Sequence, residues 1–533
     1  MFGNSLVSLT IPDEVFYAQT AKEMLKNGSW MTPYIFGQPQ FEKPVFIYWL
    51  LKSAFMVSGI NSFSARFFPA FFGMIGVVAA YFLGWIGFKD HKKAFISAIV
   101  LMTGGLYVGL ARTVFTDLVF SVFILLSLLS FYWGYSFKNR KGPGILLFFV
   151  FAGLATLTKG PLGLLIPLLA VIAFLWIRKD TKFLFGGYLF WGLLIFGLIS
   201  IPWYLLMFKL YGNAFIHEFF YNDHIRRILQ AEHISNDTWY FYPFSMIGCI
   251  FPWSFFLVAS LFFLPRHLKQ KDNAFPVFLV CWITVTFVIF QAAHSKLVSY
   301  IFPLFPALAL FCGGFITDSL VREKRSRLFH LALSLSLLVV FLMPLALIVI
   351  STWFRHYLSP YVSSQGAVIF FVFVFLSFGM AMLFLILKKK LLRSIYCLGL
   401  FVPLMLYFIP LVRHDIEPYL SPQESCEYLL TNYKVDNTIL SSKFFVRGVK
   451  YYTDKEVAVI DMPGTPFFSP HPVPFLNTPG KVRDFLRGQK ITYAILKKNS
   501  VEDIDQLVGG EFKYTVLKVI GNEYIVKIET IAK

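Results

Sequence analysis

Twelve long apolar stretches without Asp or Glu constrain the fold of this chain more than any other feature. They lie near residues 63–88, 94–111, 118–135, 143–157, 161–177, 183–208, 244–264, 274–292, 297–317, 328–350, 367–387 and 394–412. A helix needs about 20 apolar residues to cross a bilayer core of roughly 30 Å, and lipid forces its backbone groups to bond internally. We therefore predict an α-helical polytopic membrane protein with about 12 spans, of which 143–157 and 161–177 are short.

The composition excludes an ordinary soluble protein. Hydrophobic residues make up 57% of the 533 residues and charged residues only 14%, whereas a soluble chain carries roughly 25% charged residues. The absence of acids from the twelve stretches also counts against an ion-coupled transporter, because such proteins usually keep an acid at mid-membrane.

The formal charge of +19 reports the orientation of the spans. Alternate connecting segments carry 20 Lys and Arg in one set and 7 in the other. Basic connections stay in the cytoplasm and match anionic lipids there, so the charge implies no nucleic acid. The basic set comprises 89–93, 136–142, 178–182, 265–273, 319–327 and 388–393, and the other set comprises 112–117, 158–160, 209–243, 293–296 and 351–366.

Three regions follow from this topology. Residues 1–62 form an outer-face loop with juxtamembrane helices, 63–412 the transmembrane domain, and 413–533 an outer, periplasmic domain. The first region has no span and no signal-peptide pattern, so we expect a further span before it, which gives 13 in the complete protein. The alternative is that its translocation needs no further signal. Val45–Val57 is too short to cross and is typical of an interfacial helix.

The tail is predicted to be a small α/β domain. Its short apolar runs indicate strands at Ile491–Leu496 and Tyr514–Ile520, and the latter joins Glu523–Ile528 through Gly521-Asn522. Val482–Leu486 indicates a short helix, and 463–479 a Pro-rich surface loop. We find no phosphate-binding glycine motif, so no nucleotide cofactor is expected.

The outward-facing acids are the first candidates for chemistry. Asp13 and Glu14 follow Pro12 at a predicted helix start, and Asp117 lies in a short outer turn before a span. Such acids are commonly helix caps. In an acid-poor protein they are also candidates for a catalytic base or an orienting group.

The outward-facing cations are candidates for binding phosphate. Lys43 lies in Phe41-Glu42-Lys43-Pro44, directly before a predicted helix. Two roles are consistent with this position: a surface ion pair, or a contact to a lipid phosphate. Lys159, Lys296 and Arg227 lie at outer helix ends or in the outer loop, where they either extend to the interface or form a cationic rim. Composition and spacing therefore indicate an outward-facing membrane enzyme or carrier for phosphorylated lipids.

The ordered motifs resemble the bacterial lipid A aminoarabinose transferases, which are grouped with the dolichyl-phosphate-mannose-protein mannosyltransferase relatives. The resemblance covers roughly residues 12–310. It is carried by Asp13-Glu14, Tyr17-Ala18, Gly28, Trp30, Pro33, Phe41-Glu42-Lys43-Pro44, Tyr48-Trp49, Asp117, Thr158-Lys159-Gly160, Pro202-Trp203, Phe220, Asp223-His224-Ile225-Arg226-Arg227, Trp239 to Tyr242, Pro252-Trp253, Ser295-Lys296-Leu297 and Ser299-Tyr300-Ile301.

This resemblance implies a GT-C glycosyltransferase that transfers a sugar with inversion from a polyprenyl-phosphate carrier at the outer face. It implies that the acids beside the reacting sugar are Asp13, with Glu14, and Asp117. Lys43, Arg227, Lys296 and Tyr300 would surround the carrier phosphate, and Tyr17 and Lys159 would also contact substrate. Glu42 and His224 would be the pair that holds a divalent metal cation.

Two departures bear on the sugar and the acceptor. Phe16 stands where the aminoarabinose enzymes typically carry Arg, and Gln40 where Tyr is common. The leading hypothesis is an inner-membrane transferase that moves a sugar from undecaprenyl phosphate to lipid A or a related envelope glycolipid. Alternatives are a protein or polysaccharide acceptor, or a lipid-sugar flippase or transporter, against which the acid-free spans count.

Overall fold

The structure is a computed structural model that describes residues 3–262, 274–321, 327–353, 365–407, 409–462, 464, 473–507 and 511–531. The connecting segment 265–273 and most of 319–327, 351–366 and the Pro-rich stretch 463–479 lie outside these residues.

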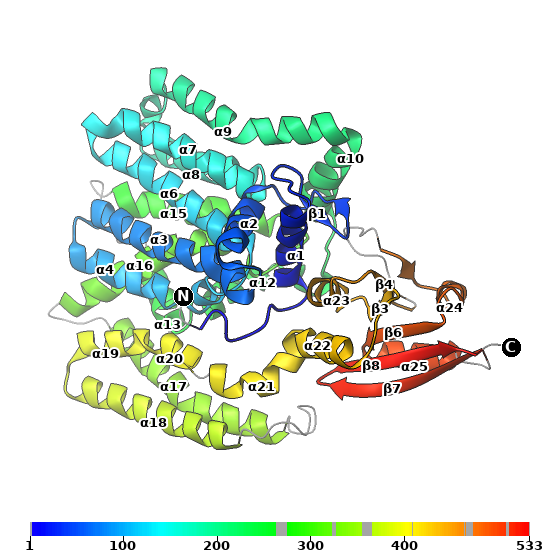
Figure 1. Cartoon of the computed structure of the whole chain (residues 1–533). Helices are drawn as coiled ribbons and strands as arrows, with labels where there is room; N and C mark the ends of the chain where they lie inside the picture. Colours follow the sequence, from blue (N-terminus) through cyan, green and yellow to red (C-terminus); the bar gives the residue numbers. More distant parts are fainter. Residues whose placement is uncertain are drawn as a thin grey trace.

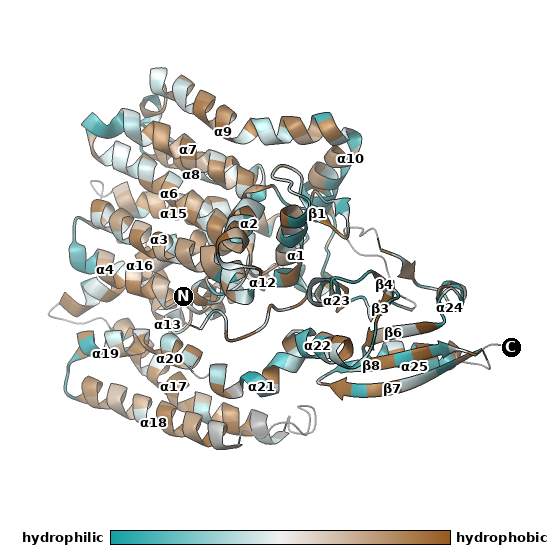
Figure 2. Ribbon diagram, in the orientation of Figure 1, coloured by the Kyte–Doolittle hydropathy of each residue, from teal (hydrophilic) through white to brown (hydrophobic). Residues whose placement is uncertain are grey.

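The apolar stretches form a stack of helices that fills one side of the molecule (Figure 1). Within the described ranges, eight helices are long and apolar enough to cross a membrane. Apolar residues cover these helices, whereas polar and apolar residues mix in the C-terminal part (Figure 2). The helices of the stack are α3 (Ser62–Phe88), α4 (His91–Met102), α5 (Gly105–Leu110), α6 (Thr116–Ser136), α7 (Lys141–Lys159), α8 (Leu162–Ile177), α9 (Gly187–Tyr211), α12 (Phe241–Cys249), α13 (Ser254–Leu261), α15 (Ala274–Gln291), α16 (Phe305–Val321), α17 (Arg327–Trp353), α18 (Gln365–Leu387), α19 (Leu391–Gly399) and α20 (Phe401–Tyr407).

Four of the twelve predicted spans are shorter or broken. Stretch 161–177 forms only the 16 residues of α8, and stretches 94–111, 244–264 and 394–412 are each divided between successive helices. Backbone groups at two of the breaks are hydrogen-bonded to each other, because the Gly105 N–H donates to the Phe251 carbonyl at 2.9 Å. The Trp253 indole likewise donates to the Thr103 hydroxyl at 2.9 Å. Such pairing allows irregular backbone inside a bundle, where it is shielded from lipid.

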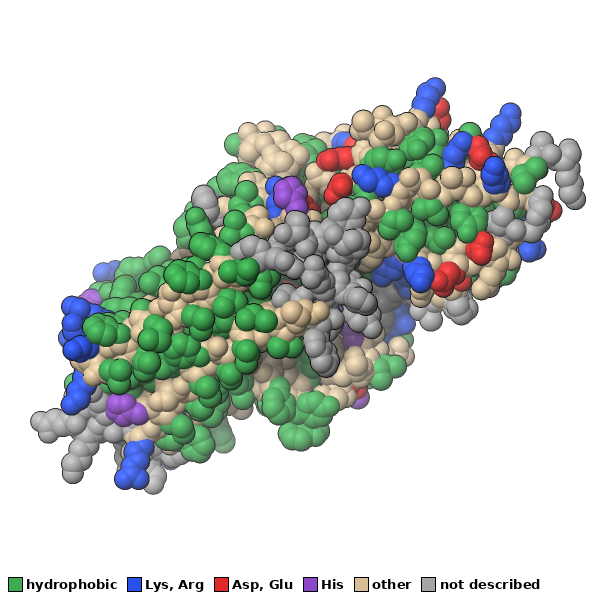
Figure 3. Space-filling model, turned by 90° about the horizontal axis from the view of Figure 1, so that it is seen from below, with side chains coloured by type: hydrophobic (Ala, Val, Ile, Leu, Met, Phe, Trp, Pro, Cys, Tyr) green, Lys and Arg blue, Asp and Glu red, His purple; other side chains and the backbone are tan. Residues whose placement is uncertain are grey.

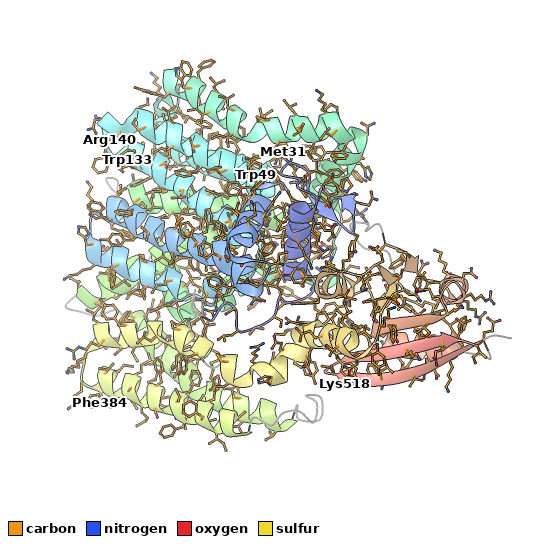
Figure 4. The ribbon with its side chains drawn as sticks, in the orientation of Figure 1. Met31, Trp49, Trp133, Arg140, Phe384 and Lys518 are labelled. Carbon is orange, nitrogen blue, oxygen red and sulfur yellow. The ribbon has the colours of Figure 1, made fainter. Side chains whose placement is uncertain are left out.

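Basic side chains gather at one end of the helical stack, away from the C-terminal domain (Figure 3). Arg140 and Trp133 lie at this end (Figure 4), where the guanidinium is 5.7 Å from the indole centroid. A cation beside an aromatic ring is typical of a membrane interface.

Short elements cover the opposite end of the stack. Helix α1 (Asp13–Lys26) and helix α2 (Phe46–Ser58) flank a small hairpin, and α2 confirms the helix predicted at 45–57. The remaining elements of this region and of the connections are β1 (Tyr34–Ile35), β2 (Gln38–Pro39), η1 (Lys138–Arg140), η2 (Thr181–Phe183), α10 (Asn213–Phe215), the π-helix η3 (Ile216–Ile225), α11 (Arg226–Leu229), η4 (Ile234–Asn236) and η5 (Phe302–Leu304).

The C-terminal part is a six-stranded mixed sheet with helices, as the sequence predicts. Its strand order is β5-β4-β3-β6-β8-β7. The first four strands are parallel to one another, and β8 is antiparallel to both of its neighbours, β6 and β7. The hairpin through Gly521-Asn522 is confirmed, with Ile520 opposite Glu523. The elements are α21 (Ile409–Leu420), α22 (Gln423–Asn432), β3 (Ile439–Ser442), α23 (Val446–Thr453), β4 (Val457–Ile460), β5 (Phe475–Leu476), α24 (Pro479–Arg487), β6 (Ile491–Leu496), α25 (Lys498–Leu507), β7 (Phe512–Ile520) and β8 (Glu523–Thr530).

The C-terminal domain is attached to the region before the first long helix. Lys22 of α1 donates to the Tyr451 carbonyl at 2.7 Å and pairs with Asp454 at 2.9 Å. The Ile11 N–H donates to the Leu420 carbonyl at 3.0 Å. These contacts hold α23 against α1, so residues from both ends of the chain meet beside one end of the helical stack.

Candidate active site

A cavity of about 1220 Å³ lies between the helical stack and the C-terminal domain. The helical part contributes α1, the turn at Glu42-Lys43, the start of α6, the end of α7 and the 297–300 segment. The C-terminal domain contributes the residues that follow β3, β4 and β6. The cavity exceeds the roughly 300–1,000 Å³ of an ordinary small-ligand pocket, so it has room for more than one ligand.

Asp223 joins two of the predicted phosphate ligands. The ammonium of Lys43 lies 2.7 Å from one carboxylate oxygen of Asp223, and Nε of Arg227 lies 3.0 Å from the other. Burial alone would raise the pKa of Asp223, but Lys43 and Arg227 outweigh it and hold this pKa below its usual value. The carboxylate therefore stays ionised and fixes both cations at the cavity wall.

Tyr300 extends this network to Lys159 and Asp117. The Tyr300 hydroxyl accepts a hydrogen bond from Arg227, and Lys159 lies 4.6 Å from the Tyr300 ring centroid. The same ammonium donates to Asp117 at 2.5 Å, and Asp117 is buried in the first turn of α6. Five of the predicted residues, Lys43, Asp117, Lys159, Arg227 and Tyr300, therefore line one cavity as a connected set of cations, carboxylate and phenol.

Asp13 faces the cavity from the first turn of α1. Its side chain is 56% exposed, which leaves the carboxylate accessible to a ligand. Enclosure by the surrounding protein raises its pKa, and the guanidinium of Arg447, 3.9 Å away, opposes this rise. A carboxylate with a raised pKa is suited to accept a proton or to stabilise developing positive charge.

Tyr17 lies one turn further along α1 and also lines the cavity. Its ring centroid is 6.2 Å from that of Tyr48 and 6.3 Å from that of Phe115. Burial, together with Tyr48 and nearby acids, raises the pKa of Tyr17 well above its usual value. The phenol is therefore neutral and keeps its hydroxyl proton.

Glu42 and His224, the predicted metal pair, have different positions. Glu42 lines the cavity, and burial raises its pKa against the opposing charges of Arg447 and Lys43. His224 is not among the described lining residues, and its Nδ1 is 2.7 Å from the Phe219 carbonyl. Among the described residues no three His, Cys, Asp or Glu come together as metal ligands. This pair offers at most two ligands, fewer than the three protein ligands of a catalytic zinc site, so we derive no step through a metal.

Glu14 and Lys296 have partners outside the network at the cavity. The Glu14 carboxylate is fully buried and accepts hydrogen bonds from Nε and Nη2 of Arg66 at 2.8 and 2.6 Å. It also accepts the Val114 N–H at 2.9 Å, so its oxygens serve the packing of three segments. The Lys296 ammonium pairs with Asp237 at 2.9 Å. Neither Glu14 nor Lys296 is among the described residues that line the cavity.

Three cations of the C-terminal domain were missed by the sequence analysis. Lys443, Arg447 and Lys497 all line the cavity. Arg447 lies on α23 with its guanidinium carbon 4.7 Å from the Phe16 ring centroid. A signal that could have found Lys497 is its place directly after the predicted strand Ile491–Leu496, because ligand-binding residues often follow strands.

Comparison with known proteins identifies the family resemblance independently. Residues 3–215 match the family model described as dolichyl-phosphate-mannose-protein mannosyltransferase. The chain is 30% identical over 315 residues to an undecaprenyl phosphate-alpha-4-amino-4-deoxy-L-arabinose arabinosyl transferase of Enterobacter sp. (strain 638), covering 58% of this chain and 55% of that protein. It is 32% identical over 323 residues to such a transferase of Pseudomonas fluorescens, covering 59% and 57% of the two chains.

These alignments cover less than two thirds of the length of the curated relatives. The fold is matched over almost the whole chain by a crystal structure of ArnT from Cupriavidus metallidurans bound to undecaprenyl phosphate. That match has a TM-score of 0.76 and 18% identity, and covers 98% of this chain and 94% of the other. The resemblance inferred from the motifs is therefore confirmed, and so is the predicted polytopic GT-C-type fold with a small C-terminal domain.

Proposed function

We propose that the protein is an inverting glycosyltransferase that moves a sugar, such as an amino sugar, from undecaprenyl phosphate to lipid A or a related envelope glycolipid. The observation that carries this proposal is the set Lys43, Arg227 and Tyr300, which presents two cations and a phenol to one cavity that Asp13 also faces. The names of the two transferases to which the chain is similar support the same donor and reaction.

The orientation proposed for the enzyme places this cavity at the periplasmic face of a bacterial inner membrane. Lys and Arg gather at the end of the helical stack away from the C-terminal domain (Figure 3). Basic connections stay on the cytoplasmic side, so the cavity and the C-terminal domain lie on the other side.

The donor phosphate is bound by Lys43, Arg227 and Tyr300 in this mechanism. Asp223 holds both cations through its two oxygens. The bond between the sugar C1 and the phosphate oxygen breaks, and the polyprenyl phosphate departs with the electron pair. Preorganised cations stabilise the charge that develops on this leaving group. A phosphate already carries that charge well, so its departure needs no proton.

The acceptor attacks C1 from the face opposite the departing phosphate, and a single displacement inverts the configuration. Asp13 faces the cavity where an acceptor oxygen can approach. With a phosphate acceptor on lipid A no proton has to move, and the Asp13 carboxylate stabilises the positive charge on the sugar. With an alcohol acceptor the hydroxyl proton passes to Asp13 as the new bond forms.

Mass spectrometry of envelope glycolipids tests the proposal. Cells that lack the gene should lose a lipid A species whose mass exceeds that of the unmodified form by one sugar. Expression of the wild-type chain should restore this species, and expression of Lys43→Ala should not.

The matched control is Lys434→Ala, because the Lys434 side chain is 88% exposed and lies outside the cavity lining. An unchanged lipid A profile in the deletion strain, with a sugar lost from envelope protein or polysaccharide, would instead identify one of these as the acceptor. If no glycan changes, the assignment as a transferase is wrong.

A further inference from the structure

Three parallel strands of the C-terminal domain end at the active-site cavity. Strands β3, β4 and β6 run in the same direction, and β3 pairs with both of the others. Residues at the end of each strand or just after it line the cavity. Ser442 ends β3 and is followed by Lys443 and Phe444, Asp461 and Met462 follow β4, and Lys497, Asn499 and Ser500 follow β6. The cavity therefore lies outside the carboxyl edge of this sheet, which is where open α/β sheets bind ligands.

The strand order identifies one place along this edge as the strongest candidate. From β3 the chain crosses to β4 and β5 on one side, and β6 lies on the other side of β3. The connections therefore leave β3 and β6 in opposite directions, and a crevice opens between them at such a switch point. Ser442 ends β3 and Lys497 follows β6, and the Lys497 N–H donates to the Ser442 hydroxyl at 2.8 Å.

The side chains at this edge have the chemistry of a phosphorylated carbohydrate site. The Lys497 ammonium lies 4.1 Å from the Phe444 ring centroid, and Phe444 is 38% exposed. The ammonium lies over one face of the ring and can bind a phosphate oxygen, and the exposed part of the ring can contact the C–H groups of a sugar. Lys443 adds a second cation, 3.7 Å from Asp461.

Hydroxyl-binding groups surround these cations. Ser442 and Ser500 are both buried and hydrogen-bonded to each other at 2.8 Å, and Asn499 and Asp503 also line the cavity. Carboxylates and amides accept hydrogen bonds from sugar hydroxyls, whereas a purely anionic ligand would be repelled by Asp461 and Asp503. The mixture therefore favours a hydroxyl-rich ligand with an anionic group over a free phosphate.

The donor leaves this wall free for the second substrate. In the proposed reaction the carrier phosphate lies at Lys43, Arg227 and Tyr300, all of which belong to the helical part. Arg447 lies between the two walls, because it extends from α23 to Asp13. The acceptor must reach C1 from the side opposite the phosphate, so it meets the C-terminal wall of the cavity.

We propose that the carboxyl edge of β3, β4 and β6 is the acceptor subsite and binds the phosphorylated, hydroxyl-rich head group of a glycolipid through Lys443, Lys497 and Phe444. This inference rests on the proposed transferase function and assigns the C-terminal domain to acceptor recognition.

Steady-state kinetics of the purified full-length enzyme test the subsite with lipid A as the probe. Lys497→Ala and the double variant with Lys443→Ala should raise the KM for lipid A roughly tenfold or more, the loss expected when hydrogen bonds to charged groups are removed. The KM for the lipid-linked donor should not change. The matched control is Lys498→Ala, because this neighbouring side chain is 72% exposed, pairs with Glu502 and lies outside the cavity lining.

Two binding measurements keep the inference separate from the proposed function. Undecaprenyl phosphate should raise the melting temperature of wild type and of both lysine variants equally, and its failure to stabilise any of them would count against the transferase itself. Retention of lipid A micelles should be strong for wild type and Lys498→Ala and weak for the double variant. Equal retention by wild type and the double variant, or no retention by either, would overturn the acceptor subsite.

Discussion

The guanidinium of Arg447 lies 3.9 Å from the carboxylate of Asp13, although one residue belongs to the C-terminal domain and the other to the first helix. The same guanidinium is 4.7 Å from the Phe16 ring centroid. The sheet domain therefore places a cation directly beside the carboxylate to which we assign the reaction. Its folding and docking therefore add a positive charge beside Asp13.

Replacement of Arg447 by Gln should move the acid limb of the pH–rate profile to higher pH. Enclosure raises the pKa of Asp13 and Arg447 opposes it, so removal of the guanidinium raises this pKa further. Asp13 then becomes protonated at a higher pH, and the rate falls earlier as the pH decreases. A shift of about one pH unit is expected for a lost opposite charge at this distance.

The control for this variant is Arg487→Gln, because Arg487 is half exposed and pairs with Glu511 at the surface of the same domain. Its profile should match that of wild type. An Arg447→Gln enzyme with an unmoved acid limb would show that Asp13 is not the group that titrates.

Replacement of Asp13 by Asn should abolish transfer without lowering the amount of protein in the membrane. The carboxylate is half exposed to the cavity, and its ion pair among the described residues is the long contact to Arg447. Removal of a catalytic acid or base typically costs 10²- to 10⁴-fold in rate. Turnover of the purified variant measures the loss, and undecaprenyl phosphate binding should be retained. Wild-type turnover in this variant would remove Asp13 from the mechanism.

Replacement of Glu14 by Gln, unlike that of Asp13 by Asn, should lower the stability of the protein. Its buried carboxylate accepts both Nε and Nη2 of Arg66, and a neutral amide leaves that guanidinium without a counter-charge. Breaking a buried ion pair costs about 3–5 kcal/mol. Thermal unfolding in detergent should show a lower melting temperature for Glu14→Gln than for the adjacent variant Asp13→Asn. Equal melting temperatures would contradict the structural role of Glu14.

Much of the fold was predictable because local patterns determine it. The apolar stretches, the helix at 45–57 and the hairpin through Gly521-Asn522 follow from periodicity and turn chemistry. The broken spans were not predictable, because hydropathy does not register a helix break. The hydrogen bond from the Gly105 N–H to the Phe251 carbonyl joins residues from two different stretches, so it depends on tertiary packing.

The residues of the candidate site likewise include some that the sequence predicts and some that it does not. Lys43, Asp117, Lys159 and Tyr300 belong to motifs before residue 310, and all four line the cavity. Arg447 has no local signal, because its role arises only when α23 packs on α1. The buried position of Glu14 could not be predicted for a related reason, since its partner Arg66 lies on another helix and a sequence cannot show which of two adjacent acids is buried.

Chelation decides whether the predicted metal pair, Glu42 and His224, takes part in the reaction. These residues offer at most two ligands. The positive charges of Arg447 and Lys43 already act on the Glu42 carboxyl group and oppose the rise of its pKa. We therefore expect transfer by the purified enzyme to survive exhaustive chelation, with metal content checked by elemental analysis before the assay. Glu42→Ala should then behave the same with and without added Zn²⁺. Activity that is lost on chelation and restored by Zn²⁺ in wild type, but not in Glu42→Ala, would return the pair to the mechanism, because only a bound ion links these three results.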